Sequence, residues 1–277
     1  MRHTDFSAVG TDPHADPLSY AVAARDAGVL DMVSEALATG RTKLAFQPIV
    51  YNKDHSRVAF HEGLMRIIDR TGRIIPAQQF MPAVESTQIG RTIDVQALDL
   101  ALIALSRDPE LRLSVNMSAR SIGFTRWRRV LDAGLTRHPR IGERLILEIT
   151  ESSAMLMPEL VIAFMEELQD LGIAFALDDF GAGYTAFRYL RDFYFDILKI
   201  DGQFIKGLAG HSDNQVLTEA LVMIGKHFDM FTIAEGVEDE LDADFLTQID
   251  LDCVQGYITG APSLTPPIEQ RQKSRLA

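Results

Sequence analysis

The sequence predicts an α/β protein folded as a TIM-type (β/α)8 barrel, modified with an opening β-hairpin and an N-terminal helix. Apolar, β-rich runs alternate with segments of helical periodicity along most of the chain, and this alternation is typical of βα units in a parallel sheet. Eight β-rich runs occur, the number that closes a barrel of this type. The 277 residues are 47% hydrophobic and suffice for one barrel domain of about 250 residues.

The chain is expected to begin with a tail, a helix and a hairpin. Residues 1–17 contain two prolines and two histidines and predict a flexible tail. In residues 18–40, Ala, Val and Leu recur at helical spacing, and Gly40 suits the position that ends a helix. Residues 44–50 and 58–67 are β-rich runs around a polar turn, so they are expected to pair as an antiparallel hairpin.

The rest of the barrel is expected to follow in βα order. A helical stretch is predicted over residues 76–107, with a break near Gly90. The six further strands are expected at residues 111–118, 144–151, 173–180, 197–201, 230–237 and 253–258. Together with the hairpin they give a barrel domain over residues 41–263. The last residues, 264–277, are polar and are expected to form a frayed tail.

Composition argues against several classes of protein. The one cysteine, Cys253, permits no disulfide within the chain and lies in an apolar run, so a buried inert thiol is expected. No apolar stretch reaches the roughly 18 residues of a membrane span, and the first residues lack the apolar core of a signal peptide. A cytoplasmic location is therefore expected. The net charge of −12 argues against a surface for long nucleic acids, although bound divalent cations would still admit a small phosphodiester.

Acidic and polar residues recur where one apolar run after another gives way to loop residues. These residues are Glu62, Asn116, Glu148, Asp178, Asp179, Lys199, Glu235, Glu238 and Gln255. The carboxyl-terminal tips of barrel strands face a pocket, whereas a carboxylate inside a buried strand would be costly. Carboxylates gathered at one mouth would repel one another unless cations lay between them. Oxygen ligands of this kind suit Mg²⁺ or Mn²⁺, and no Cys or His pair is spaced for zinc.

Each of these residues also has a simpler interpretation. A single carboxylate at a strand end is often solvated or caps a helix, and Lys199 could serve only as a salt-bridge partner. Because Lys199 alternates with apolar neighbours, however, a barrel strand would point its ammonium inward. His61 has the opposite strand parity to Glu62 and is expected to be a surface or packing residue. Asp94 and Asp99 lie on a predicted helix and are assigned to its solvated face.

Seven motifs, in order, resemble one protein family. The segments HEGLMR, SVNMSAR, LEITES, ALDDFGAGYTAFRYL, DILKID, IAEGVE and VQGYITGAP, spread over roughly residues 44–263, resemble the EAL domain of bacterial cyclic di-GMP phosphodiesterases. The resemblance implies a modified TIM barrel that hydrolyses one phosphodiester bond of cyclic di-GMP to give linear pGpG. It also implies two divalent cations, Mg²⁺ or Mn²⁺, and a homodimer.

The resemblance implies ligands for both cations. The first would be held by Glu62, Asn116, Glu148 and Asp178. Asp178 would bridge to the second, which also involves Asp179 and, directly or through water, Glu235. Two cations about 3.5 to 4 Å apart lower the pKa of a shared water and neutralise charge on the phosphoryl oxygens. Ca²⁺ is expected to inhibit, because its longer bonds and looser coordination would misplace the water.

Catalytic and substrate-binding roles follow from the same resemblance. Lys199 and Glu235 would be catalytic, with Lys199 holding the attacking water and helping to remove its proton. Glu151 would fix the loop DFGAGYT. The substrate-binding residues would be Gln47, Arg66, Glu238 and Gln255. A guanidinium suits bidentate contact with a phosphate, so Arg66 is expected to clamp the substrate.

Four residues depart from the family pattern. Gly63 replaces the alanine of the EAL signature, which leaves the neighbouring glutamate untouched but loosens the strand by roughly 0.5 to 1 kcal/mol. Ile67 stands where the family more often has tryptophan, and Thr259 and Ala261 stand where Phe and a basic residue are frequent. These last three changes put substrate affinity in question more than metal chemistry.

A second class of function is a receptor or protein-interaction module that keeps the fold without hydrolysis, as some EAL-like domains do. Degenerate members usually lack several of the acidic ligands, whereas this chain has all of them. Hydrolysis is therefore the favoured hypothesis. The predicted N-terminal helix could contact a protein partner.

Overall fold

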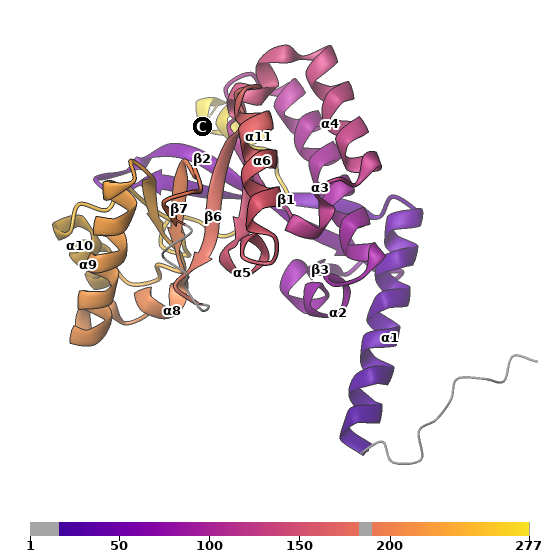
Figure 1. The fold of residues 1–277 in the computed structure, drawn as a ribbon, viewed down its shortest axis with the longest axis horizontal. Coiled ribbons are helices and arrows are strands. Elements are labelled where there is room, and N and C mark those ends of the chain that lie inside the picture. The colour runs from indigo at the N-terminus through magenta and orange to yellow at the C-terminus, as the bar shows by residue number, and fades with distance from the viewer. Residues whose placement is uncertain (1–16, 183–189, 277) are drawn as a thin grey trace, which may run out of the picture.

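Eight strands close into a barrel in the computed structural model, which describes residues 17–182 and 190–276 (Figure 1). The barrel strands are β1 (Thr42–Tyr51), β2 (Asp54–Ile68), β4 (Leu113–Asn116), β5 (Leu145–Thr150), β6 (Ala174–Phe180), β7 (Ile197–Ile200), β8 (Phe231–Ala234) and β9 (Cys253–Val254). β1 is antiparallel to both β2 and β9, and the other neighbours pair in parallel. Because β1 joins the two ends of the strand order, the sheet closes and the predicted fold class is confirmed.

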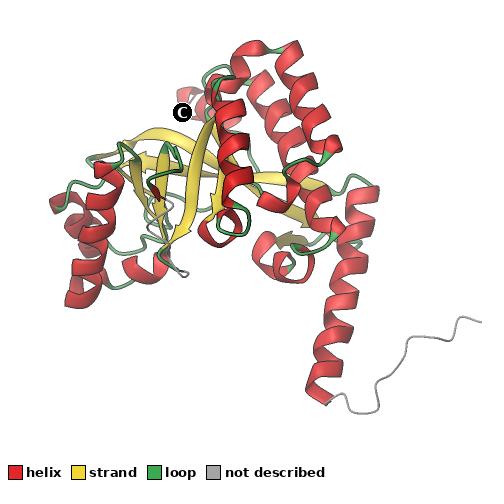
Figure 2. Ribbon diagram, in the orientation of Figure 1, coloured by secondary structure: helices red, strands yellow, loops and turns green. Residues whose placement is uncertain are grey.

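Helices lie outside the barrel strands (Figure 2). The longer ones are α1 (Pro17–Ala38), α3 (Gln88–Arg107), α4 (Thr125–Arg137), α6 (Pro158–Gln169), α9 (Ser212–His227), α10 (Glu240–Gln248) and α11 (Pro267–Leu276). The single-turn helices are α2 (Met81–Val84), α5 (Glu151–Ala154) and α8 (Gly202–Ile205). Within the described ranges, none of the helices has the length and apolar content needed to cross a membrane.

The opening of the chain follows the prediction closely. α1 leads into β1 through a short turn that contains Gly40. Gly40 has a φ of 67°, the left-handed conformation that glycine adopts without strain. β1 and β2 pair as the predicted hairpin, from Thr42 opposite Ile67 to Tyr51 opposite Asp54. The short strand β3 (Ile74–Pro76), which pairs with β2 outside the barrel, was not predicted.

An apolar layer fills the barrel interior beneath the strand tips. Its buried members are Ile49, Phe60, Ile146, Ala176, Ile197, Ile233 and Cys253. Side chains alternate along a strand, so the residue two positions further on points to the same side. Cys253 is buried as predicted, and burial raises the pKa of its thiol to about 12, which keeps the reactive thiolate scarce.

The helix break was predicted at the wrong place. Gly90 lies inside α3, and the break occurs at residues 85–87, where the Thr87 side chain caps the helix. A Cβ at Gly90 would lie 2.8 Å from the carbonyl oxygens of Val84 and Glu85. Glycine is therefore required there by the close approach of the preceding turn, and it does not interrupt the helix.

Residues 264–277, predicted as a frayed tail, contain α11. Arg271 of this helix pairs with Asp108, whose side chain is buried, and with Glu110 at 3.5 Å. The sequence did not predict α11, because ion pairs to a distant part of the chain help to hold it and it lacks an apolar face of helical period.

Candidate metal and catalytic site

Most of the polar residues predicted at strand ends gather at the carboxyl-terminal mouth of the barrel. Glu62 follows the interior residue Phe60 by two positions, and Lys199 follows Ile197 in the same way. Glu148, Asp178, Glu235 and Gln255 stand in the same relation to Ile146, Ala176, Ile233 and Cys253. The period of two in each strand therefore carries these side chains to the inside of one mouth.

Lys199 lies at the centre of this cluster. Its Nζ is 2.6 Å from Glu235 Oε1, 2.8 Å from both Glu148 Oε2 and Asp178 Oδ1, and 3.6 Å from Glu62 Oε2. The Lys199 side chain is only 1% exposed. One ammonium facing four carboxylates leaves an excess of negative charge, which a simple salt bridge does not explain.

Two amides orient Glu62. Asn116 Nδ2 donates to Glu62 Oε1 at 2.8 Å, and Gln255 Nε2 donates to Glu62 Oε2 at 2.6 Å. Gln255 Nε2 also lies 3.2 Å from Gln47 Oε1, and Gln47 Nε2 donates to the Gly260 carbonyl at 3.2 Å. The amide network fixes both oxygens of Glu62 and links four of the predicted site residues.

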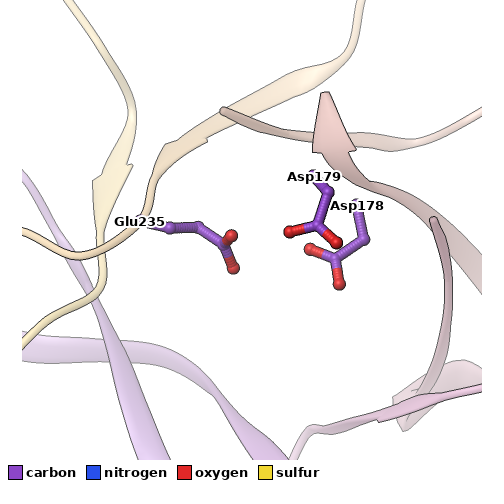
Figure 3. A group of neighbouring side chains, drawn as sticks. All are labelled: Asp178, Asp179 and Glu235. Carbon is purple, nitrogen blue, oxygen red and sulfur yellow. The ribbon is translucent and has the colours of Figure 1, made fainter. Parts of the chain in front are cut away.

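Asp178 and Asp179 precede Phe180, the last residue of β6, and break the alternation of this strand. Successive strand residues normally point to opposite faces, but the pairing of β6 with β7 is irregular after Leu177, and Asp179 has a φ of 54°. Aspartate tolerates this left-handed conformation better than most residues. As a result, the two carboxylates lie next to each other and face Glu235 (Figure 3).

Glu151 lies behind the cluster, at the start of α5. Its side chain is buried, and Glu151 Oε2 accepts a hydrogen bond from the backbone N–H of Gly181 at 3.1 Å. Gly181 begins the segment that follows β6 and has a φ of 94°. Glu151 thus ties the end of β6 to α5, whereas the rest of the DFGAGYT loop, residues 183–185, lies outside the described residues.

Two predicted substrate-binding residues lie at the margin of the cluster. Arg66 is half-buried and donates to the Met65 carbonyl at 3.0 Å, and burial lowers the pKa of its guanidinium against the opposing charge of Glu62. Glu238 is exposed in the loop after β8. Among the described residues its side chain makes no hydrogen bond or ion pair, so the structure does not bring it into the cluster.

Asp94, assigned from the sequence to a solvated face, is buried. Its Oδ2 accepts hydrogen bonds from the Ser118 backbone N–H at 3.1 Å and from Ser121 Oγ at 2.6 Å. It therefore fixes the turn that follows Asn116. The apolar residues that flank Asp94 on the same helix are the sequence feature that could have predicted its burial. Asp99 is exposed, as predicted.

Burial and mutual repulsion raise the pKa values of several carboxyl groups. Burial, with the neighbouring carboxylates, raises the pKa of Glu148 to about 8, and burial with the charge of Asp178 raises that of Asp179 to about 6. Burial likewise holds the pKa of Glu235 well above its ordinary range, against the charge of Lys199. Burial alone would lower the pKa of Lys199, but the surrounding carboxylates raise it well above its ordinary value.

The residues present fit divalent cations. Asp178, Asp179 and Glu235 each offer a carboxylate oxygen, and these atoms lie within 4.8 Å of one another. Glu148 Oε1 is buried and accepts no hydrogen bond from the described part of the chain, so it keeps a lone pair for a ligand bond. Carboxylate and amide oxygens are the ligands of hard cations. A bound cation would also offset the repulsion that raises the carboxyl pKa values.

These pKa shifts predict how stability depends on pH when cations are removed. In chelator, the folded chain keeps a proton on Glu148 up to about pH 8, whereas an unfolded glutamate releases its proton near pH 4.3. The free energy of unfolding is therefore expected to fall as pH rises from about 5 to 8. Thermal unfolding across this interval measures it, and Mg²⁺ should reverse the loss. A midpoint that rises with pH in chelator would contradict this account.

A family model described as the EAL domain matches residues 30–262, a range that contains every predicted site residue. The chain belongs to the EAL domain family. Among curated relatives, a bifunctional diguanylate cyclase and cyclic di-GMP phosphodiesterase, MucR of Pseudomonas aeruginosa, is 31% identical over 87% of this chain and 36% of its own length. The cyclic di-GMP phosphodiesterase PdeB of Shewanella oneidensis is 29% identical over 88% of this chain and 29% of its own length. The chain thus spans about a third of these relatives.

Solved EAL structures share the fold. The MucR phosphodiesterase in complex with cyclic di-GMP superposes with a TM-score of 0.78 at 30% identity, covering 88% of this chain and 99% of that one. The EAL domain of FimX from Pseudomonas aeruginosa, bound to cyclic di-GMP, has a TM-score of 0.78 at 24% identity, covering 86% and 97%. At that identity, the FimX match supports the fold alone.

Two departures from the EAL pattern have structural explanations. At Gly63, a Cβ would lie 3.1 Å from both the Ser114 carbonyl oxygen and Val115 Cγ1, so there is little room for the alanine of the signature. Ile67 is fully buried in the core. By strand alternation it lies on the opposite face from Arg66.

The other two departures lie in the segment after β9. Thr259 Oγ1 donates to the Gly256 carbonyl at 3.0 Å and so stabilises the turn there. Ala261 is exposed. A Cβ at Gly256 would lie 1.9 Å from the Val237 carbonyl oxygen, so this turn packs tightly against the loop after β8.

Proposed function

We propose that this EAL domain hydrolyses one phosphodiester bond of cyclic di-GMP and releases linear pGpG. The observation that carries the proposal is the set of carboxylates around buried Lys199 at the barrel mouth. The relative MucR is named as a bifunctional diguanylate cyclase and cyclic di-GMP phosphodiesterase, and its phosphodiesterase structure is a complex with cyclic di-GMP. Both facts support the same substrate for this chain.

The proposed cofactors are two Mg²⁺ or Mn²⁺ ions. Glu62, Asn116, Glu148 and Asp178 would hold the first, while Asp178 and Asp179 would hold the second, with Glu235 acting directly or through a water. Divalent cations, when bound, lower the pKa of a water and neutralise charge on the phosphodiester. The site has an excess of negative charge, because four carboxylates lie within 3.6 Å of one ammonium. This excess supports the assignment of cations.

Lys199 would position the attacking water and stabilise negative charge on it as the proton leaves. Its raised pKa favours this electrostatic role for the ammonium. Glu235 Oε1 lies 2.6 Å from Lys199 Nζ, so its carboxylate would be placed to receive that proton. Glu151 would keep Asp178 and Asp179 in register through its hydrogen bond to Gly181.

Substrate binding is assigned to the rim of the mouth. Arg66 would bind a phosphate oxygen pair with its guanidinium, and Gln47 and Gln255 would contribute amide groups from the network around Glu62. Glu238, which is exposed, would reach the substrate only from the loop after β8.

Mass spectrometry of the product formed in ¹⁸O-water tests the proposed reaction. Attack by water on one phosphodiester is expected to yield pGpG with a single ¹⁸O in its new terminal phosphate, in Mg²⁺ or Mn²⁺ and not in chelator. Absence of product, or a first product other than pGpG, would show that the assigned reaction is wrong.

Ca²⁺ is expected to block turnover when added to the Mg²⁺ enzyme. Its ligand distances of about 2.3 to 2.6 Å and irregular coordination contrast with the octahedral geometry of Mg²⁺ at about 2.0 to 2.1 Å, so the water would be misplaced. A titration of Ca²⁺ into the chromatographic assay measures the effect, with Mn²⁺ as the control that retains activity. Equal rates in Ca²⁺ and Mg²⁺ would overturn this prediction.

We also propose that the protein forms a homodimer, and α9 offers a surface for this contact. Val216, Leu217 and Met223 on this helix are 65%, 48% and 67% exposed, so the helix presents apolar surface to solvent. Met223→Glu is expected to shift the protein from dimer to monomer in sedimentation velocity, because burying the carboxylate would be costly. Met157→Glu, at another exposed methionine, is the control. A wild-type monomer at micromolar concentration would exclude the dimer.

A further inference from the structure

α3 and α4 run side by side (Figure 1). A groove is lined by residues of these two helices, together with His138 and Ile141. Its volume is about 320 Å³. The floor is apolar and consists of Leu102, Ile103, Val130, Ala133, Gly134 and Ile141. The two helices approach closely at Gly134, where a Cβ would lie 2.7 Å from Leu102 Cδ1. Ile103 is 38% exposed, so the apolar floor is open to solvent.

Three arginines line the rim of this groove at helical spacing. Arg126, Arg129 and Arg137 of α4 are three and then eight residues apart, so they lie on one side of the helix. All three are exposed, and none forms an ion pair with the described residues. Arg128, which does not line the groove, is by contrast paired with Asp132 and Glu167.

The groove is the centre of a basic segment in an acidic chain. Residues 120–144 contain seven arginines and two acidic residues, whereas the whole chain has a net charge of −12. Asp99 is the only acidic residue that lines the groove among the described residues. Concentrating positive charge beside apolar surface favours a negatively charged partner.

The groove is separate from the candidate catalytic site. Its residues His138 and Ile141 precede β5 and therefore lie toward the amino-terminal end of the barrel strands. The carboxylates around Lys199 lie at the carboxyl-terminal mouth. In barrels of this type the catalytic groups occupy the carboxyl-terminal face, so this groove is free for another contact.

We propose that the groove between α3 and α4 binds an acidic amphipathic helix of a partner protein. The 12 residues from Arg126 to Arg137 extend about 16 Å along α4, which matches three turns of an added helix. Its apolar side chains would pack on Ile103 and Val130, and carboxylates every three or four residues would pair with the rim arginines. This interaction surface is independent of the hydrolytic activity.

Fluorescence anisotropy with defined peptides tests this surface. Four fluorescein-labelled, hydrocarbon-stapled helical peptides would each carry one stripe of Leu and one stripe of Glu. The peptides differ in how far the Glu stripe is shifted relative to the Leu stripe, which gives four registers. A scrambled peptide of identical composition serves as the control. At 150 mM salt, at least one register is expected to bind wild-type protein. The Arg129→Glu, Arg137→Glu double variant should weaken this binding at least about tenfold. Lys206→Glu reverses the charge of an exposed lysine that follows α8 and does not line the groove, and it should change binding less than about twofold.

Each result either supports or overturns the proposal. Thermal unfolding of the double variant should match wild type, since both arginines are exposed. Failure of all four registers to bind, or equal binding of the scrambled peptide, would overturn it. Cosedimentation with phosphatidylserine vesicles that the double variant abolishes would instead assign the groove to a membrane surface. Self-association that the double variant abolishes would assign it to a second copy of this chain.

Discussion

Asp178→Asn is expected to abolish hydrolysis of cyclic di-GMP. Asp178 lies 2.8 Å from Lys199 Nζ and also within the carboxylate group formed with Asp179 and Glu235, so it is the residue that joins the two proposed cation positions. Loss of an outer partner of a metal ligand already costs about 10- to 100-fold. Loss of a shared ligand should therefore exceed 100-fold in kcat/KM, measured by chromatographic release of pGpG.

Asp170→Asn is the matched control for this variant. Asp170 is exposed at the end of α6, and the same substitution there is expected to leave turnover unchanged. Calorimetric titration of Mn²⁺ gives a second readout, in which Asp178→Asn should lose binding and Asp170→Asn should keep it. An Asp178→Asn variant with wild-type kcat/KM would remove Asp178 from the site.

Lys199→Met is expected to lower turnover at least about 100-fold and also to destabilise the cation-free fold. Methionine keeps the length of the side chain, but the carboxylates of Glu148, Asp178 and Glu235 lose their only close cation among the described residues. Removing one member of a buried ionic cluster costs about 3 to 5 kcal/mol. Urea unfolding in chelator measures this loss, and kcat under saturating Mg²⁺ measures the catalytic effect.

The destabilisation of Lys199→Met should be larger at pH 8.5 than at pH 5.5. Without the ammonium, the buried carboxyl groups hold protons in the folded state and release them on unfolding, so stability falls as pH rises. Mg²⁺ should restore part of it. Lys206→Met, at an exposed lysine, is the control. Full activity of Lys199→Met would exclude the proposed role of Lys199, and unchanged stability at pH 8.5 would contradict the electrostatic account.

Strand positions and most of the site followed from one simple pattern in the sequence. An apolar residue inside the barrel and a polar residue two positions later place a side chain at the mouth, and Phe60 with Glu62 and Ile197 with Lys199 illustrate this. The pattern is local, so sequence alone reveals it. The identity of the neighbours that make Lys199 the centre of the cluster is not local, and only the closed barrel defines it.

Features that depend on backbone irregularity or on distant contacts could not be predicted. Asp179 points to the same side as Asp178 because of a positive φ and an irregular pairing, and strict alternation gives the opposite expectation. Asp94 is buried by a turn that lies 24 residues further along the chain, at Ser118. α11 is held in part by the ion pair of Arg271 with a residue far away in the sequence.

The most direct test of the central claim measures turnover and binding on the same purified protein. Cyclic di-GMP is incubated in Mg²⁺, Mn²⁺, Ca²⁺ or chelator and followed by chromatography, while a parallel titration in Ca²⁺ measures nucleotide binding. We expect pGpG in Mg²⁺ and Mn²⁺ alone, with binding retained in Ca²⁺. Binding without product in any cation would make this EAL domain a cyclic di-GMP receptor and contradict the assignment of the carboxylates around Lys199 to hydrolysis.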